Sequence, residues 1–121
     1  MIKQLAHLCF RSHQLPAMTA FYRDVLGLRH LFSVGERMAF FDCGGVRLML
    51  SQPSSPELDH PSSILYFQVA DIEAAHAALV AHGVRIEQAP NLVARMPDHE
   101  LWLSAFRDPE GNLLELMCEK R

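Results

Sequence analysis

The two halves of this 121-residue chain repeat one another. Three segments correspond in each half, HLCF with ILYF, LGL with HGV and GVRLML with GNLLEL, at residues 7–10 and 64–67, 26–28 and 82–84, and 45–50 and 111–116. Each half reads as a strand, a helix and about three strands, and a half of about 55 residues is a poor independent core. The repeat therefore predicts two βαβββ modules that pack together.

Hydrophobic spacing predicts the elements of the first half. Apolar residues recur at i, i+3, i+4 and i+7 over residues 15–26, which is typical of a helix. Pro16 fits the first turn of this helix, and Gly27 fits the position just past its end. Strands are predicted at residues 5–10, 29–34, 37–43 and 46–51.

The second half follows the same plan. Asp71 can cap a helix over residues 72–81, whose apolar face passes through Ile72, Ala75, Leu79 and Val80. Strands are predicted at residues 64–69, 85–88, 92–96, 101–106 and 112–118. Two of them, 85–88 and 92–96, are alternatively one strand that bends around Pro90.

Length and composition favour one soluble domain over residues 1–121, with modules at about 1–53 and 64–121 and a polar, proline-rich connection, PSSPELDHPSS, at 53–63. A net charge of −3 with dispersed signs gives no reason to expect nucleic acid. No apolar run approaches the roughly 18 residues of a membrane span, and no signal peptide is visible. Three cysteines without CxxC spacing suggest reduced thiols, so we expect a cytoplasmic protein.

Glu115 is the first candidate site residue. Strand alternation places Leu113, Glu115 and Met117 on one face, so the carboxylate is flanked by apolar side chains. A carboxylate in such a place is costly unless a cation, a metal or a donor pairs with it. Glu115 is therefore either a metal ligand or general base, or the partner of an arginine such as Arg47.

His7 is the second candidate. It shares its predicted strand face with Leu5 and Cys9. A histidine on an apolar strand is either a hydrogen-bonded core residue or a ligand or acid–base group, and both interpretations stay open.

Four segments carry a resemblance to a known family: the opening strand with His7, FYRDVLGL at 21–28, FQVADI at 67–72 and FRDPEGNLLEL at 106–116. Together they resemble the vicinal-oxygen-chelate superfamily of glyoxalases, bleomycin- and fosfomycin-resistance proteins and extradiol dioxygenases. The resemblance covers essentially the whole chain. It implies an α+β fold in which two tandem βαβββ modules form curved mixed sheets around a central cup.

The resemblance also implies where a metal would bind. In metal-dependent members the ligands come from the first and last strands of each half, which correspond here to His7, Met49, Ile64 and Glu115. His7 and Glu115 fit a divalent ion such as Mg, Mn, Fe, Zn or Ni, whereas isoleucine cannot bind a metal and a thioether suits hard cations poorly. A third ligand could come from His60, His99 or Glu100; the alternative for both histidines is solvent exposure in polar loops.

The remaining polar and aromatic residues divide into two groups. Five could line or guard the cup, or belong to core or rim: Arg11, Tyr66, Arg95, Trp102 and Phe106. Four histidines without common spacing are expected at the surface: His13, His30, His76 and His82.

Two functions follow from these residues. The first is a metal-dependent lyase, transferase or dioxygenase, in which an ion held partly by His7 and Glu115 stabilises a substrate oxyanion and Glu115 is the catalytic group. The second is a metal-free protein that sequesters a small organic molecule, as bleomycin-resistance proteins do. A structural or partner-binding subunit fits least well. The resemblance implies a homodimer, with a monomer as the alternative.

Overall fold

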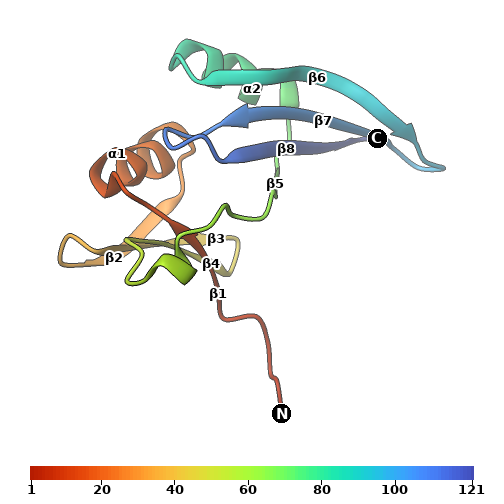
Figure 1. Cartoon of the computed structure of the whole chain (residues 1–121). Helices are drawn as coiled ribbons and strands as arrows, with labels where there is room; N and C mark the ends of the chain where they lie inside the picture. The colour runs from red at the N-terminus through yellow and green to blue at the C-terminus, as the bar shows by residue number, and fades with distance from the viewer. The chain divides into compact units, whose positions relative to one another are not determined.

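Two four-stranded mixed sheets, each accompanied by a helix, make up the computed structural model, which describes all 121 residues (Figure 1). The chain divides into two compact units, Met1–Ser62 and Ser63–Arg121. The division falls at the end of the proline-rich connection. The expected α+β class with two tandem βαβββ modules is confirmed.

The first unit has the sheet order β1-β4-β3-β2, in which β1 runs parallel to β4 and the other pairs are antiparallel. Its elements are β1 (His7–Arg11), α1 (Leu15–Ala20), the π-helical turn η1 (Phe21–Val25), β2 (Arg29–Val34), β3 (Met38–Cys43), β4 (Val46–Ser51) and the 3₁₀ turn η2 (Pro56–Leu58). The predicted helix over 15–26 is therefore present, but it changes to π geometry after Ala20. The N–H of Leu26 donates to the carbonyl of Phe21, five residues back, at 3.0 Å.

The core of the first unit lies between its helix and one face of its sheet. Tyr22 is fully buried, with its ring centroid 6.4 Å from that of Phe10 on β1 and 6.3 Å from that of Phe41 on β3. Met18 and Leu50 are also fully buried. The helix therefore covers the sheet face that carries Phe10, Phe41 and Leu50.

The second unit has the matching order β5-β8-β7-β6, with β5 parallel to β8. Its elements are β5 (Leu65–Gln68), α2 (Ile72–Ala81), β6 (Arg85–Arg95), β7 (Glu100–Arg107) and β8 (Leu113–Lys120). The alternative of a single bent strand is confirmed, because β6 continues through Pro90. Its register shifts on the span from Gln88 to Asn91, where the missing N–H of proline interrupts the ladder.

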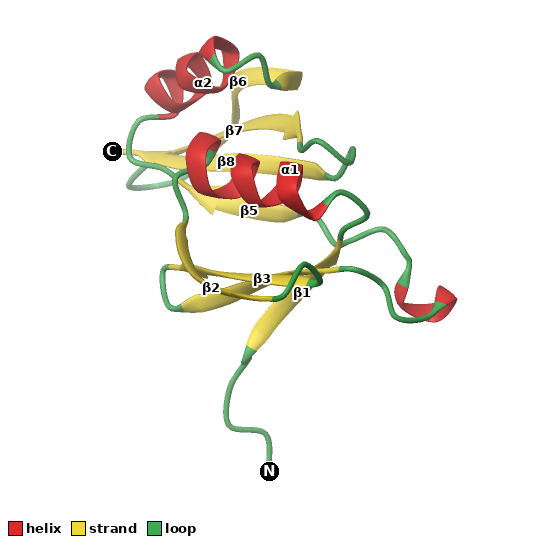
Figure 2. Ribbon diagram, turned by 90° about the vertical axis from the view of Figure 1, so that its left-hand side faces the viewer, coloured by secondary structure: helices red, strands yellow, loops and turns green.

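Helix α2 lies beside β6 (Figure 2). Asp71 caps it as predicted, since its carboxylate accepts from the N–H of Ala74 at 3.0 Å. Ile72 and Leu79 are buried, but Val80 is 53% exposed, so its predicted place on the apolar face is wrong. Val80 follows Leu79 directly, and one helical residue turns the side chain about 100° away from its neighbour.

The turn between β7 and β8 is held by one buried carboxylate. Asp108 is 5% exposed, and it accepts from the N–H of Glu110 at 2.9 Å, the N–H of Asn112 at 3.0 Å and the amide of Asn112 at 2.7 Å. Gly111 supplies the positive φ of 84° that closes the turn. This turn sets the register of β8, which buries Leu114 and Leu116 and leaves Glu115 on the other face.

Candidate functional site

Each sheet has one face turned away from the helix of its own unit, which we call its open face. Side chains alternate between the two faces of a strand, so the residues next to the buried ones lie on the open face. In the first unit these residues are His7, Cys9, Arg11, Phe32, Val34, Met38, Phe40, Asp42, Arg47, Met49 and Ser51. In the second unit, the open face carries Tyr66, Gln68, Leu101, Leu103, Ala105, Leu113, Glu115 and Met117. These two faces contain both candidate residues, His7 and Glu115.

Two phenylalanines and an arginine form what we call the aromatic platform: Phe32, Phe40 and Arg47. The Phe32 and Phe40 rings are stacked, with centroids 4.6 Å apart and planes at 25°. The Arg47 guanidinium carbon lies 5.8 Å from the Phe32 centroid and 5.9 Å from that of Phe40, within the range of a cation–π contact. Phe32 is 44% exposed and Phe40 only 8%, so the platform offers one open ring beside an exposed cation.

His7 lies beside this platform. It is exposed, it faces Arg47 in the parallel register of β1 and β4, and its ring meets Phe40 edge-on at 6.1 Å. The interpretation of His7 as a core histidine is therefore wrong. The side chain is available to a ligand on the open face of the first sheet.

Glu115 is half-buried on β8, opposite Tyr66 of β5 and Ala105 of β7. Hydrogen bonding to the Glu115 carboxylate, together with its negative charge, raises the pKa of Tyr66. The cross-strand neighbour of this carboxylate is therefore a tyrosine, where the sequence suggested an arginine such as Arg47. A prediction that β5 pairs with β8 in parallel would have placed Tyr66 opposite Glu115.

The two other positions implied by the resemblance offer nothing to a hard cation. Met49 presents a thioether on the open face of the first sheet, and Ile64 is an exposed apolar side chain just before β5. No group of three or more His, Cys, Asp or Glu side chains is arranged to hold a metal ion. The residues present therefore do not complete a three-ligand site for a divalent ion.

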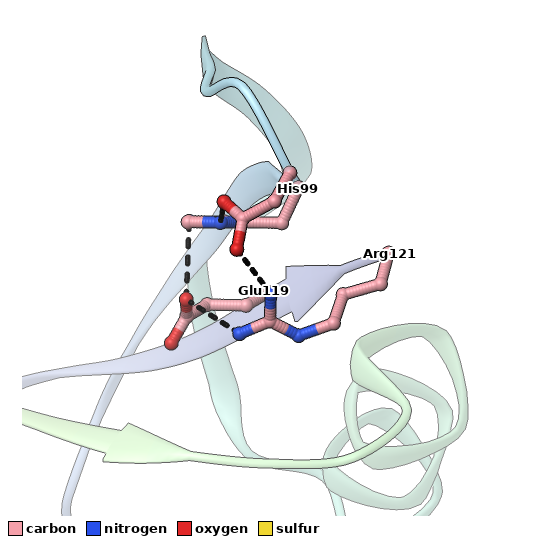
Figure 3. Close-up of polar contacts among 4 residues, drawn as sticks. His99, Glu119 and Arg121 are labelled. Carbon is pink, nitrogen blue, oxygen red and sulfur yellow. Dashed lines mark hydrogen bonds and ion pairs between the residues drawn. The ribbon is translucent and has the colours of Figure 1, made fainter.

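His99 occupies a different place from the exposed loop expected of it. Its side chain is 16% exposed, with Nδ1 2.8 Å from Asp98 and Nε2 3.0 Å from Glu119 (Figure 3). Arg121 approaches the same two carboxylates, at 2.8 and 3.5 Å. Both ring nitrogens face carboxylate oxygens, so His99 serves to tie the β6–β7 turn to the end of β8 rather than to bind a metal.

Two of the suggested cup residues belong to the helix-facing side of the second sheet. Phe106 is buried, and Trp102, on the same face, donates to Glu100 at 3.1 Å with the Lys120 ammonium 4.1 Å from its ring centroid. Arg95 is exposed and pairs with Glu100 at 3.6 Å. None of these three side chains lies on an open face with Glu115.

The proline-rich connection builds two cavities in the first unit that the sequence did not predict. One, of about 500 Å³, is polar and lined by Ser12, His13, Gln52, Pro53, Ser54, Ser55, Pro56 and Asp59. The other, of about 380 Å³, is lined by Cys9, Arg11, Met38, Met49, Ser51, Gln52, Pro53, Ser54, Leu58 and His60. The second cavity opens from the same sheet face as the aromatic platform.

Asp59 fastens this connection to the end of β1. Its Oδ1 accepts from Arg11 at 3.0 Å and lies 2.8 Å from His13 Nε2. These two partners, His13 above all, hold the pKa of Asp59 below its usual range. The suggested cup residue Arg11 therefore does line a cavity, but it does so within the first unit.

This arrangement of repeated modules matches a known family. A model of the Glyoxalase/Bleomycin resistance protein/Dioxygenase superfamily matches residues 4–116, and the chain belongs to that superfamily. No helix has the length and apolarity needed to cross a membrane.

Individual relatives share about a quarter of their residues with this chain. Biphenyl-2,3-diol 1,2-dioxygenase 3 of Rhodococcus globerulus is 28% identical over 96% of this chain, which spans only 63% of that protein's length. An integron cassette protein from the mobile metagenome of V. cholerae has a similar structure, with a TM-score of 0.77 and 26% identity over 98% of this chain and 96% of its own. Lactoylglutathione lyase from Agrobacterium tumefaciens, with a TM-score of 0.74 and 23% identity over 97% and 94% of the two chains, shares the fold.

Proposed function

We propose that this chain binds a small planar aromatic molecule that carries an acidic oxygen, such as a phenol or a carboxylate, and that it does so without a resident metal. The observation that carries the proposal is the aromatic platform, in which a stacked phenylalanine pair lies beside an exposed guanidinium on an open sheet face. This pairing of a flat apolar wall and a fixed cation selects both parts of such a ligand.

The platform suits this ligand in two ways. The open ring of Phe32 can stack on a second aromatic ring, which is worth about 0.5–1.5 kcal/mol beyond the area it buries. The planar guanidinium of Arg47 can donate two parallel hydrogen bonds to a carboxylate or to adjacent phenolic oxygens. The name of the dioxygenase relative gives it an aromatic diol as substrate, which is a ligand of this shape.

The remaining ligand positions favour binding without a metal. Met49 and Ile64, which suit a hard divalent ion poorly, occupy two of the four ligand positions that the resemblance implies. The third, Glu115, lies opposite Tyr66 and raises the pKa of that hydroxyl. A ligand that meets Phe32, Phe40 and Arg47 needs none of these groups.

Calorimetric titration of metal-stripped protein with biphenyl-2,3-diol and with benzoate tests the proposal. We expect saturable binding in the presence of a chelator, weakened about tenfold in Arg47→Ala because loss of a cation–π contact and a charged hydrogen bond costs about 1–2 kcal/mol. Arg37→Ala is the matched control, since Arg37 is also exposed in the first unit but lies in the β2–β3 turn. Equal binding by the two variants, or no binding to the wild type, would contradict the proposal.

A metal-dependent lyase, transferase or dioxygenase is the second candidate. It is favoured by His7 and Glu115, which both lie on open faces and are the two positions whose side chains suit a divalent ion. Metal analysis of the purified protein after incubation with Mg, Mn, Fe, Zn or Ni tests it. Stoichiometric metal that is lost in both His7→Ala and Glu115→Ala would replace the first proposal with this one.

We also expect a homodimer, because superfamily members often pair two chains. Analytical ultracentrifugation at micromolar concentration distinguishes the homodimer from a monomer. Titration with the aromatic ligand in the same experiment tells whether the ligand favours the paired form.

A further inference from the structure

We propose that the 380 Å³ cavity of the first unit is a binding site for monovalent copper, with Cys9, Met38, Met49 and His60 as its ligands. These four side chains line one cavity, to which they contribute three sulfur atoms and one imidazole. The site does not depend on the proposed aromatic ligand.

The sheet register brings the three sulfur residues together. Cys9 on β1 lies directly opposite Met49 on β4, and neighbouring strands are about 4.8 Å apart. Met38 on β3 lies opposite Ser51, which makes it the diagonal neighbour of Met49. Diagonal neighbours on one face are roughly 7–8 Å apart, a gap that unbranched methionine side chains can span.

His60 reaches the same cavity from the proline-rich connection. Its Nδ1 lies 3.0 Å from the carbonyl oxygen of Pro61. A carbonyl oxygen can only accept, so Nδ1 carries the proton and Nε2 presents its lone pair. Histidine ligands in metal sites are held in this way, with one ring nitrogen donating to a carbonyl while the other binds the ion.

This set of donors selects a soft metal. Thiolate and thioether ligands favour Cu(I), whereas carboxylate and water suit hard divalent ions. Met49, whose thioether suits a hard ion poorly, is therefore a suitable ligand for a soft one. On binding, the Cys9 S–H bond breaks, its proton passes to solvent and a copper–sulfur bond forms, with no change in the oxidation state of the copper.

The two other thiols of the chain provide controls. Cys118 is buried on the helix-facing side of the second sheet, where it contacts the carbonyl of Ala70 at 3.5 Å. Cys43 lies at the end of β3 and does not line the cavity. Met96, exposed after β6, is the corresponding control for the methionines.

Competition with a chromogenic Cu(I) chelator, under anaerobic and reducing conditions, tests the site on the full chain. We expect one Cu(I) per chain, with affinity lowered in Cys9→Ser and Met49→Leu by more than the roughly 10–100-fold that loss of a supporting contact costs. Cys118→Ser and Met96→Leu should bind as the wild type does. No competition by the wild type, or equal affinity in Cys9→Ser and the wild type, would overturn the proposal.

Alkylation of the unmodified protein gives a second readout that needs no variant. Iodoacetamide labelling followed by peptide mass spectrometry should show that Cu(I) slows modification of Cys9 and leaves the rate at Cys43 unchanged. Equal rates at Cys9 with and without Cu(I) would overturn the site even if one of the variants failed to fold.

Discussion

The two repeated units are alike on their helix-facing sides and different on their open faces. Leu48 and Leu50 of β4 correspond in the repeat to Leu114 and Leu116 of β8, and all four are buried. The residue between each pair is Met49 in the first unit and Glu115 in the second. These residues that pack against the helix are therefore the same in the two units, while the residue between them on the open face differs.

The open faces differ in kind. The first carries stacked aromatic rings, an exposed arginine and several sulfur atoms. The second carries Tyr66 and Glu115 opposite one another among aliphatic residues. We therefore expect binding of an aromatic or soft ligand to depend on the first unit, and the Tyr66–Glu115 contact to influence the second unit alone.

The largest effect on stability should come from the leucines that occupy corresponding places in the cores of the two units. Leu48→Ala and Leu114→Ala each open a cavity under a helix, and we expect each to lower the free energy of unfolding by about 2–5 kcal/mol. Urea denaturation followed by circular dichroism measures both variants. A loss in one unit with none in the other would break the claim that the two cores are equivalent.

The second-largest effect on stability should come from the β7–β8 turn, which corresponds in the repeat to the β3–β4 turn. Asp108 is buried and accepts three hydrogen bonds, whereas Asp42 before the β3–β4 turn accepts one in an exposed place, from Gly45 at 3.2 Å. We expect Asp108→Ala to cost about 2–3 kcal/mol and Asp42→Ala about 0.5 kcal/mol. Equal values in chemical denaturation would show that the buried carboxylate does not set the turn.

The third effect concerns the Tyr66–Glu115 pair alone. The pKa of Tyr66 is raised above its ordinary value of 10.0 by Glu115, so Glu115→Gln should lower it. Because the folded pKa is the higher one, the contribution of this group to stability is complete below pH 10 and is lost as the pH rises through the folded pKa.

Absorbance of the phenolate, measured during alkaline titration, follows Tyr66. The other tyrosine, Tyr22, is fully buried, and subtracting the titration of Tyr66→Phe isolates the signal of interest. An unchanged pKa in Glu115→Gln would mean that the hydrogen bond is absent in solution.

Local patterns predicted much of the fold. The capping residue Asp71 and the bend at Pro90 depend on neighbours in sequence, and the structure confirms them. The two βαβββ modules that the internal repeat predicts are also confirmed. Alternation also placed Glu115 correctly between Leu113 and Met117. These features follow from backbone geometry, which a few consecutive residues determine.

Contacts between distant residues could not be predicted in the same way. The partner of Glu115 follows from the pairing of β5 with β8, which lie at opposite ends of the second unit's sequence. The contact of His99 with Glu119 joins the β6–β7 turn to the end of β8. The cavity lined by His60 exists because a segment that reads as a connection folds back onto its own sheet.

Nuclear magnetic resonance mapping of the metal-stripped protein with biphenyl-2,3-diol tests most directly whether the first open face binds an aromatic ligand without a metal. The proposed binding predicts saturable shifts of the Phe32 and Phe40 ring signals and the Arg47 side-chain signal in the presence of a chelator. Shifts that arise only after a divalent ion is added, or that leave these three residues unchanged, would contradict it.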